Sequence, residues 1–233
     1  MVLGHRGASR DAVENTLAAF EAARIQGADG VELDVHRSAD GALVVHHDAA
    51  VDGFGVLAEY ELSAIRAAIP SIPTLDEVFD QTGGMLVNVE VKNSPQDIDF
   101  DPADRCAEAV VEFVRARNLY DSVLVSSFHL PTIDRVHELD AEIPTGYLVV
   151  VDPLPLPALE IAHEHGHRAL HPHLAALGEA FVVDAVARAT ELGIALNVWT
   201  VNDPKEIVRL ARHGIHAIIT DTPAIARQAL GRE

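Results

Sequence analysis

Two short apolar segments of the chain carry acidic residues at alternating positions. Glu32 and Asp34 lie in VELDV, and Glu90 lies in LVNVEVK, where Lys92 follows two residues later. Because successive side chains of a β-strand point to opposite faces, the two acids of the first segment share one face, and Glu90 and Lys92 share a face of the second. Carboxylates that meet at one point repel one another unless a cation compensates them, and oxygen ligands favour Mg²⁺ or Ca²⁺ over zinc. The spacing therefore predicts a divalent-cation site held by Glu32, Asp34 and Glu90.

A second interpretation of these acids stays open at this point. Glu32, Asp34 and Glu90 could form a buried ion-pair network with Lys92 and hold no metal. Structural networks of this kind perturb the ionisation of their members just as catalytic sites do. Position in the sequence alone therefore does not separate a metal site from a structural network.

Two histidines could transfer protons beside such a site. His5 ends the apolar run VLGH and His47 ends ALVVHH, whereas His46 is one residue out of phase and should face elsewhere. Two imidazoles near one substrate act as base and acid when one is neutral and the other is charged. A lone histidine at a strand end is more often a hydrogen-bonded scaffold residue, but a pair beside three acids favours catalysis. We expect Asp48 and Asp221 to cap backbone N–H groups or to orient a neighbouring side chain.

The elements that must position these residues alternate along the whole chain, short apolar runs with runs of helical period. The expected strands are 2–5, 31–35, 42–47, 86–91, 122–127, 145–150, 168–172, 195–200 and 217–220, and the expected helices are 14–27, 74–83, 101–118, 130–139, 157–166, 179–193, 203–214 and 222–230. Strands 31–35 and 42–47 form one hairpin-like unit around SADG, which leaves eight strand-helix units. Eight such units predict parallel strands with right-handed crossovers, closed into an α/β (β/α)₈ TIM barrel that forms a single domain over residues 1–233.

An open, doubly wound sheet is the alternative to the barrel. It is disfavoured because Gly4 and Gly7 lack the GxGxxG spacing of a dinucleotide loop after the first strand. The irregular stretch 49–73 is the best candidate for a short insertion that acts as a lid.

The polar residues that interrupt the apolar strands fall almost entirely at their carboxyl ends. In a (β/α)₈ barrel these ends converge on one face, where such enzymes carry their sites. This set consists of His5, Glu32, Asp34, His47, Glu90, Lys92, Ser127, His171, Trp199 and Asp221. We therefore expect one site at this face, with His171 among the residues that line it.

Composition excludes several classes of function. The formal net charge is −19, with 17 Lys and Arg residues, so the chain lacks the basic surface that nucleic acids require. No apolar run approaches the roughly 18–20 residues that cross a bilayer, so no stable membrane insertion is expected. MVLGHRG does not resemble a secretory signal, and cytoplasmic residence is expected. Cys106 is the single cysteine, which excludes an intrachain disulfide and favours a buried thiol.

The stretch HEHGHRALHPH contains five histidines and invites a transition-metal interpretation. His163 and His167 are spaced for one helical face, but Gly166 should end the helix before His167. A solvated helix end is the simpler account, because cationic and polar side chains suit a helix C-terminus.

Short motifs occur in a recognisable order from His5 to Pro223. They are HRG, ENT at 14–16, ELDV, HHD, NVEVK, SSF, WTVN and TDTP. Single motifs of this length are weak, but their order and spacing together are highly specific. The chain resembles the glycerophosphodiester phosphodiesterase family.

The resemblance implies a metal-dependent hydrolase on a (β/α)₈ barrel, acting on a small-molecule glycerophosphodiester and releasing glycerol 3-phosphate and an alcohol. Matched by motif, His5 and His47 are the acid and base, and the three carboxylates hold the Mg²⁺ or Ca²⁺ ion. Arg6 resembles a phosphate contact, Lys92 a second phosphate or metal-site partner, and Trp199 an aromatic wall beside the glycerol. A core aromatic role for Trp199 is about equally supported.

One segment departs from the family pattern. The family often shows an Arg-Thr element and a Gly-rich turn after the His-Asp pair, but no arginine occurs here between Arg37 and Arg66. The lid is therefore abbreviated or altered, which bears on substrate specificity more than on the reaction.

Two other functions remain open. One is phospholipase D-like or lyase action on lysophospholipid phosphodiesters, which the absence of a basic amphipathic segment disfavours. The other is a non-catalytic barrel that binds phosphorylated ligands. Neither the alcohol group nor the oligomeric state follows from the sequence.

Overall fold

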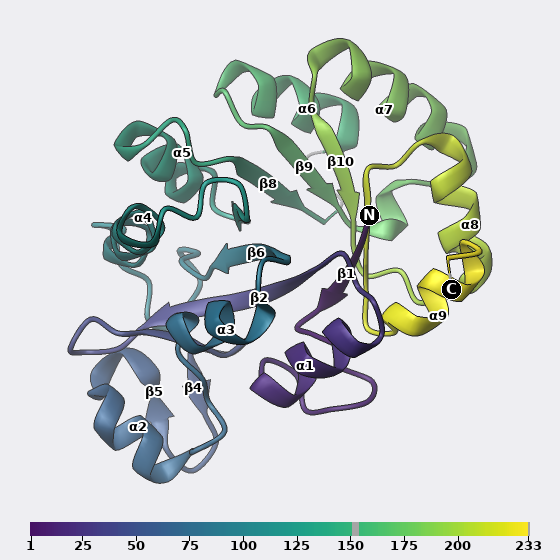
Figure 1. Cartoon of the computed structure of the whole chain (residues 1–233). Coiled ribbons are helices and arrows are strands. Elements are labelled where there is room, and N and C mark those ends of the chain that lie inside the picture. Colours follow the sequence, from purple (N-terminus) through teal and green to yellow (C-terminus); the bar gives the residue numbers. More distant parts are fainter. Residues whose placement is uncertain (151–153, 233) are drawn as a thin grey trace.

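Eight parallel strands close into a barrel in the computed structural model, which describes residues 1–150 and 154–232 (Figure 1). They are β1 (Val2–His5), β2 (Gly30–Arg37), β6 (Leu86–Val91), β7 (Val123–Ser127), β8 (Thr145–Val149), β9 (Ala169–Pro172), β10 (Ala195–Val198) and β11 (Ala217–Thr220). β1 pairs in parallel with both β11 and β2, so the sheet has no open edge between them. The predicted (β/α)₈ barrel is confirmed, and the doubly wound alternative is wrong.

Eight helices follow these strands and surround the barrel (Figure 1). They are α1 (Leu17–Ile25), α3 (Leu75–Thr82), α4 (Arg105–Arg117), α5 (Leu130–Leu139), α6 (Pro155–Glu164), α7 (Glu179–Leu192), α8 (Pro204–His213) and α9 (Pro223–Ala229). Among the described residues, no helix combines the length and apolar character needed to cross a bilayer.

Local sequence explains where these helices begin and end. Thr74 and Glu77 form a reciprocal capping box at the start of α3, and the Asp203 side chain accepts a hydrogen bond from the Lys205 N–H at the start of α8. Gly193, which ends α7, has φ +71°, a conformation that residues with a Cβ rarely adopt.

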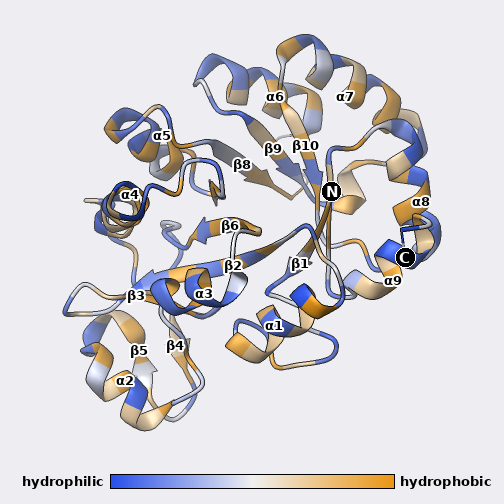
Figure 2. Cartoon of the chain, viewed as in Figure 1, coloured by the Kyte–Doolittle hydropathy of each residue, from blue (hydrophilic) through white to orange (hydrophobic). Residues whose placement is uncertain are grey.

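The core lies between the strands and the helices, as strand alternation requires. Leu33 and Val35 of β2 are fully buried in one cluster with Phe20 of α1 and Val110 of α4. Figure 2 shows the matching pattern, with hydrophobic residues on the barrel strands and mixed hydropathy around the helices. Since Leu33 and Val35 pack outward on helices, the alternate residues of β2 must point into the barrel.

Cys106 lies on α4 within this core and is buried, as expected. Burial raises the pKa of its thiol to about 12, so the thiol is protonated and unreactive near neutral pH.

The hairpin expected around SADG is present. β3 (Leu43–Val45) pairs antiparallel with β2, with Val45 opposite Val35, and it is shorter than expected because it ends before His46. The next backbone N–H, that of His46, still donates to the Asp34 carbonyl at 3.1 Å. This contact holds the HHD segment beside the carboxyl end of β2.

The stretch 49–73, expected to be irregular, contains regular elements. It holds β4 (Ala50–Val51), β5 (Gly55–Val56), a 3₁₀ turn η1 (Leu57–Glu59) and α2 (Leu62–Ala68). These elements form a separate small core around Leu57, Ile65 and Ile72 with Val44 of β3, and they lie to one side of the barrel (Figure 1). Their role as a lid stays a prediction.

Candidate active site

A cavity of about 170 Å³ opens at the carboxyl ends of the strands. It is lined by His5, Arg6, Glu32, His47, Asn88, Glu90, Lys92, Phe128, Leu148, Trp199 and Ile219. Seven of the nine predicted site residues thus line this cavity. Of the other two, Asp34 contacts the lining residues Arg6 and Lys92, and His171 is fully buried.

The three predicted metal ligands lie close together, and two of them, Glu32 and Glu90, line this cavity. Glu32, Asp34 and Glu90 each offer an oxygen within 4.8 Å of the others, and all three side chains are buried. The register of β2 and β6 explains the convergence, because it sets Asp34 opposite Glu90 and Glu32 opposite Asn88. The inward orientation expected from strand alternation is therefore what the fold produces.

The charges at this cluster are not balanced by protein groups alone. Burial and the neighbouring carboxylates raise the pKa of Glu32 and Glu90. Asp34 is different: burial would raise its pKa, but Lys92 and Arg6 lower it. Two buried carboxylates with raised pKa values are what a missing positive charge produces.

A hard divalent cation fits this set of donors. All three ligands are carboxylates, which suit Mg²⁺ or Ca²⁺. The buried Asn88 side chain also faces the cavity, and neither its oxygen nor its nitrogen has a hydrogen-bond partner within the protein. Asn88 therefore adds an uncommitted polar group where a metal or its ligands would lie.

Asp34 is fixed by side chains on three sides. Its Oδ1 lies 2.8 Å from Lys92 Nζ, and its Oδ2 lies 3.1 Å from Arg6 Nε and accepts a 2.8 Å hydrogen bond from Asn15 Nδ2. Lys92 also pairs with Glu90. The ion-pair network considered as an alternative to a metal site is thus present, but it surrounds only part of the carboxylate cluster.

Arg6 reaches this network through a strained turn. It has φ +55°, and the next residue, Gly7, has φ +86°. A Cβ on Gly7 would lie 2.5 Å from the Ala19 backbone, so the HRG turn packs against α1 only with glycine there. The turn also directs the Arg6 backbone N–H to Glu32 Oε2 at 3.0 Å.

His5 is held by a carboxylate at the end of β11. Its Nδ1 donates to Asp221 Oδ1 at 2.7 Å, and Asp221 also accepts hydrogen bonds from Asn202 and Ser9. Although burial lowers the pKa of His5, the Asp221 hydrogen bond and Glu32 raise it, so the net shift is upward. Nδ1 is thereby committed to Asp221, which leaves Nε2 for the cavity.

His47 has a similar partner but the opposite pKa shift. Its Nδ1 donates to Asp48 Oδ1 at 2.7 Å. Burial and the charge of Lys92 lower the pKa of His47. One cavity therefore contains one histidine with a raised pKa and one with a lowered pKa.

An aromatic wall closes one side of the cavity. The ring of Trp199 lies edge-on to Phe128, with 5.4 Å between centroids, and its Nε1 donates to the His171 carbonyl at 2.8 Å. The His171 ring is fully buried, is hydrogen-bonded to Asn197, and is not among the residues that line the cavity. The backbone carbonyl of His171 thus holds the Trp199 indole in place through this hydrogen bond.

A second cavity of about 200 Å³ adjoins the first. His47, Glu90, Lys92 and Phe128 line both cavities. The two cavities therefore form one elongated cleft, with Glu90 and His47 where they join.

Comparison with known proteins shows which family this chain belongs to. The sequence pattern of the Glycerophosphoryl diester phosphodiesterase family matches residues 5–225. The chain belongs to this family.

Relatives with this family's name match over nearly their whole length. A glycerophosphodiester phosphodiesterase of Caldanaerobacter subterraneus is 32% identical over 96% of this chain and 94% of its own. One from Bacillus altitudinis is 31% identical over 95% of this chain and 94% of its own. The family resemblance seen in the sequence is confirmed.

Solved structures agree with the barrel. A glycerophosphodiester phosphodiesterase from Thermotoga maritima superposes with a TM-score of 0.83 at 30% identity, covering 97% of this chain and 96% of its own. A phosphodiesterase from Oleispira antarctica, solved in complex with the product sn-glycerol-3-phosphate, has a TM-score of 0.83 at 26% identity and covers 99% and 96%.

Within this family frame, the structure gives roles to residues that sequence reasoning left unassigned. Asn15, in the ENT motif, orients Asp34, and Phe128, in the SSF motif, forms the wall with Trp199. Both residues lie in motifs of the family pattern, but the spacing of these motifs did not indicate which residues Asn15 and Phe128 contact. The expectation that Asp48 and Asp221 orient a neighbour is confirmed, since each binds a predicted catalytic histidine.

Proposed function

We propose that this chain hydrolyses glycerophosphodiesters to glycerol 3-phosphate and an alcohol with the help of Mg²⁺ or Ca²⁺. The observation that carries the proposal is one cleft in which two carboxylate-supported histidines flank three buried, undercompensated carboxylates. The family match and the product complex of the Oleispira antarctica relative support it.

Glu32, Asp34 and Glu90 would hold the cation. A bound Mg²⁺ or Ca²⁺ would supply Lewis-acid polarisation of the phosphoryl oxygens. Arg6 and Lys92 add two fixed positive charges at the same cavity, where they would bind the phosphate and stabilise the charge that develops on it.

His5 and His47 would move the protons. The lowered pKa of His47 favours it as the base that takes a proton from the attacking oxygen, and the raised pKa of His5 favours it as the acid that protonates the departing alcohol. Asp48 and Asp221 fix each ring with Nε2 free for this transfer. The attacking oxygen is either water or the glycerol hydroxyl next to the phosphate.

Trp199 and Phe128 would pack against the glycerol carbons. Their rings offer an apolar face within a polar cavity, a common arrangement around small polyols. His171, proposed from the sequence as a substrate contact, would act by holding Trp199.

A coupled assay for glycerol 3-phosphate tests the proposal. We expect turnover of glycerophosphocholine or a related diester, loss of turnover with EDTA, and recovery with Mg²⁺ or Ca²⁺. A Glu32→Gln, Glu90→Gln double variant is the control, because it keeps the side-chain shape and removes two ligands.

The same assay separates the other functions. A stable cyclic phosphate as the final product, or turnover confined to lysophospholipids, would replace hydrolysis of small diesters with lyase or phospholipase D-like action. Calorimetric binding of the diesters with no turnover of any of them would favour a non-catalytic barrel.

A further inference from the structure

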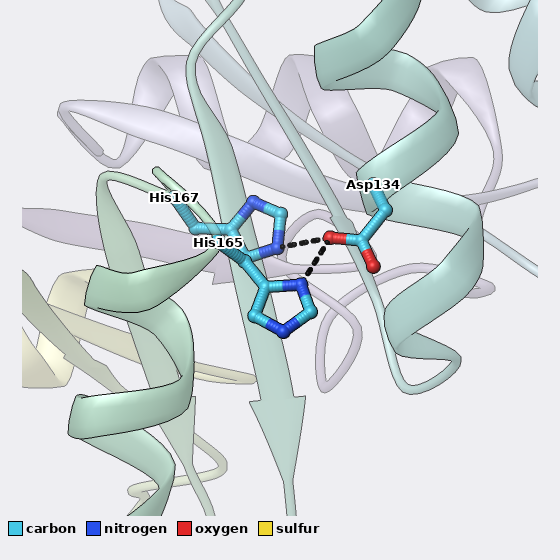
Figure 3. Close-up of side chains that lie close together, drawn as sticks. All are labelled: Asp134, His165 and His167. Carbon is cyan, nitrogen blue, oxygen red and sulfur yellow. Dashed lines mark hydrogen bonds and ion pairs between the residues drawn. The ribbon is translucent and has the colours of Figure 1, made fainter.

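Figure 3 shows a second cluster of side chains that could hold a metal ion. Asp134 comes from α5, His165 ends α6, and His167 lies two residues before β9. Each offers one ligand atom within 4.8 Å of the others. Since His167 precedes its strand, this cluster lies at the amino ends of the strands, away from the candidate active site.

His167 is the decisive member of this cluster. Its side chain is fully buried, and its Nδ1 lies 2.9 Å from Thr145 Oγ1. Its Nε2 points at Asp134, 3.1 Å from Oδ1, but makes no hydrogen bond of acceptable geometry. When Nδ1 donates to Thr145, Nε2 therefore presents a buried lone pair toward a carboxylate oxygen.

The other tautomer of His167, in which the Thr145 hydroxyl donates to Nδ1 and Nε2–H faces Asp134, needs no cation. A cation bound between Nε2 and the carboxylate would fix the first tautomer. His165 Nδ1 lies 2.8 Å from the same Asp134 oxygen, on the same side of the carboxylate as His167, so a third ligand atom is already in place (Figure 3).

We propose that Asp134, His165 and His167 form a zinc-class metal site that clamps α5, the end of α6 and the start of β9. Two imidazole nitrogens and one carboxylate oxygen are typical ligands of Zn²⁺, which takes a water as its fourth ligand. Thr145 fixes the tautomer and orientation of the buried ring, as groups behind a metal ligand commonly do. The ion can enter from solvent, because the side chain of His165 is 40% exposed.

The histidine pair considered from the sequence differs from the pair in this cluster. His163 and His167 were considered as a pair and set aside in favour of a solvated helix end. The structure leaves His163 exposed, and it pairs His167 with His165 because the chain turns at Gly166, which has φ +79°. The partner on α5 comes from a tertiary contact.

Titration of the whole protein with Zn²⁺ and Co²⁺, in the presence of millimolar Mg²⁺ to occupy the carboxylate site, tests the proposal. We expect one equivalent of Co²⁺ to bind with visible d–d absorption, and Zn²⁺ to displace it. Saturating Zn²⁺ should raise the thermal midpoint by about 5–10 °C.

His165→Ala and Asp134→Asn should each weaken Co²⁺ and Zn²⁺ binding at least tenfold. His163→Ala is the matched control, because it removes an exposed histidine two residues away and should leave binding unchanged. Both His165 and His163 are exposed, so neither variant threatens folding.

Two results would overturn the site: no Co²⁺ binding above the Mg²⁺-loaded background, or equal weakening by His163→Ala and His165→Ala. Neither readout depends on hydrolysis. The outcome of this test therefore does not depend on whether the proposed hydrolytic activity is correct.

Discussion

The two ends of the barrel each gather three potential ligands, but with different chemistry. At the carboxyl ends, Glu32, Asp34 and Glu90 offer oxygen alone, beside the part-buried cations Arg6 and Lys92. At the amino ends, Asp134 and two histidines offer one oxygen and two nitrogens. Both sets lie within 4.8 Å, so the donor atoms and neighbours, and not the spacing, decide which metal each could hold.

The surroundings of the two clusters also differ. The carboxyl-end cluster opens into a cleft that contains Arg6, Lys92 and two catalytic candidates. The amino-end cluster joins helices and a strand, and no described residue of it lines that cleft. We therefore expect the first to control activity and the second to control stability, since functional sites of this fold lie at the carboxyl ends.

The largest effect should follow from removing the carboxylate ligands. The Glu32→Gln, Glu90→Gln variant should lower kcat/KM at least about a thousandfold and abolish the response to Mg²⁺ or Ca²⁺, because metal stabilisation of the transition state contributes several kcal/mol. Steady-state kinetics across a metal series measures both.

The matched change at the other end is His165→Ala. Assayed with Mg²⁺ and no added zinc, it should retain full activity. A comparable loss of activity in both variants would show that the two clusters do not differ in function.

A smaller loss is expected from His47→Ala, about 10²–10⁴-fold in kcat, because one general base is removed. The wild-type pH profile should fall on the acid side below the usual histidine pKa of about 6.5, since the pKa of His47 is lowered, and the variant should lose this limb. His46→Ala is the control, as His46 bonds to the Asp48 backbone. Full activity of His47→Ala would remove the two-histidine scheme.

Asp221→Asn should cost roughly a hundredfold, because it removes the group that fixes the His5 tautomer. The hydrogen bond to Asp221 raises the pKa of His5, so its loss should lower that pKa and move the alkaline limb of the pH profile to lower pH. A loss of activity with an unchanged alkaline limb would contradict a positioning role for Asp221.

The contrast between the ends also shows what the sequence can predict. Strand alternation within VELDV and NVEVK places three acids inside the barrel, so the first cluster follows from local periodicity and barrel closure. Asp48 and Asp221 were expected to cap backbone N–H groups or to orient a neighbour. Their contacts with the histidines arise from adjacency for Asp48 and from the convergence of strand ends for Asp221.

The second cluster could not be predicted from the sequence in this way. Asp134 and His167 are 33 positions apart on different elements, and only the packing of α5 and α6 on the same strand, β8, brings them together. Asn15 was missed for the same reason, because its contact with Asp34 depends on the turn that Arg6 and Gly7 make. The strands β4 and β5 were missed because each has only two residues, and α2 was missed because it has only seven.

The smallest expected effect concerns the barrel interior between the two clusters. Burial lowers the pKa of His171 to about 3 from 6.5. The unfolded chain therefore binds a proton below pH 6.5 that the folded protein does not, so this residue makes stability fall as pH drops from 6.5 toward 3 and has no effect above that window. Between pH 6.5 and 5, its contribution is about 1.5 kcal/mol.

Urea denaturation of wild type and His171→Gln at pH 5.0, 5.75 and 6.5 measures this contribution. The variant should show a pH dependence flatter by about 1.5 kcal/mol, even if it is less stable at every pH, because glutamine does not titrate. His163→Gln, at an exposed position, should keep the wild-type slope. Equal slopes in wild type and His171→Gln would mean that His171 takes up a proton in the folded barrel over the same pH range as in the unfolded chain, and Asn197 would then have to accept the hydrogen bond of the protonated ring through its amide oxygen.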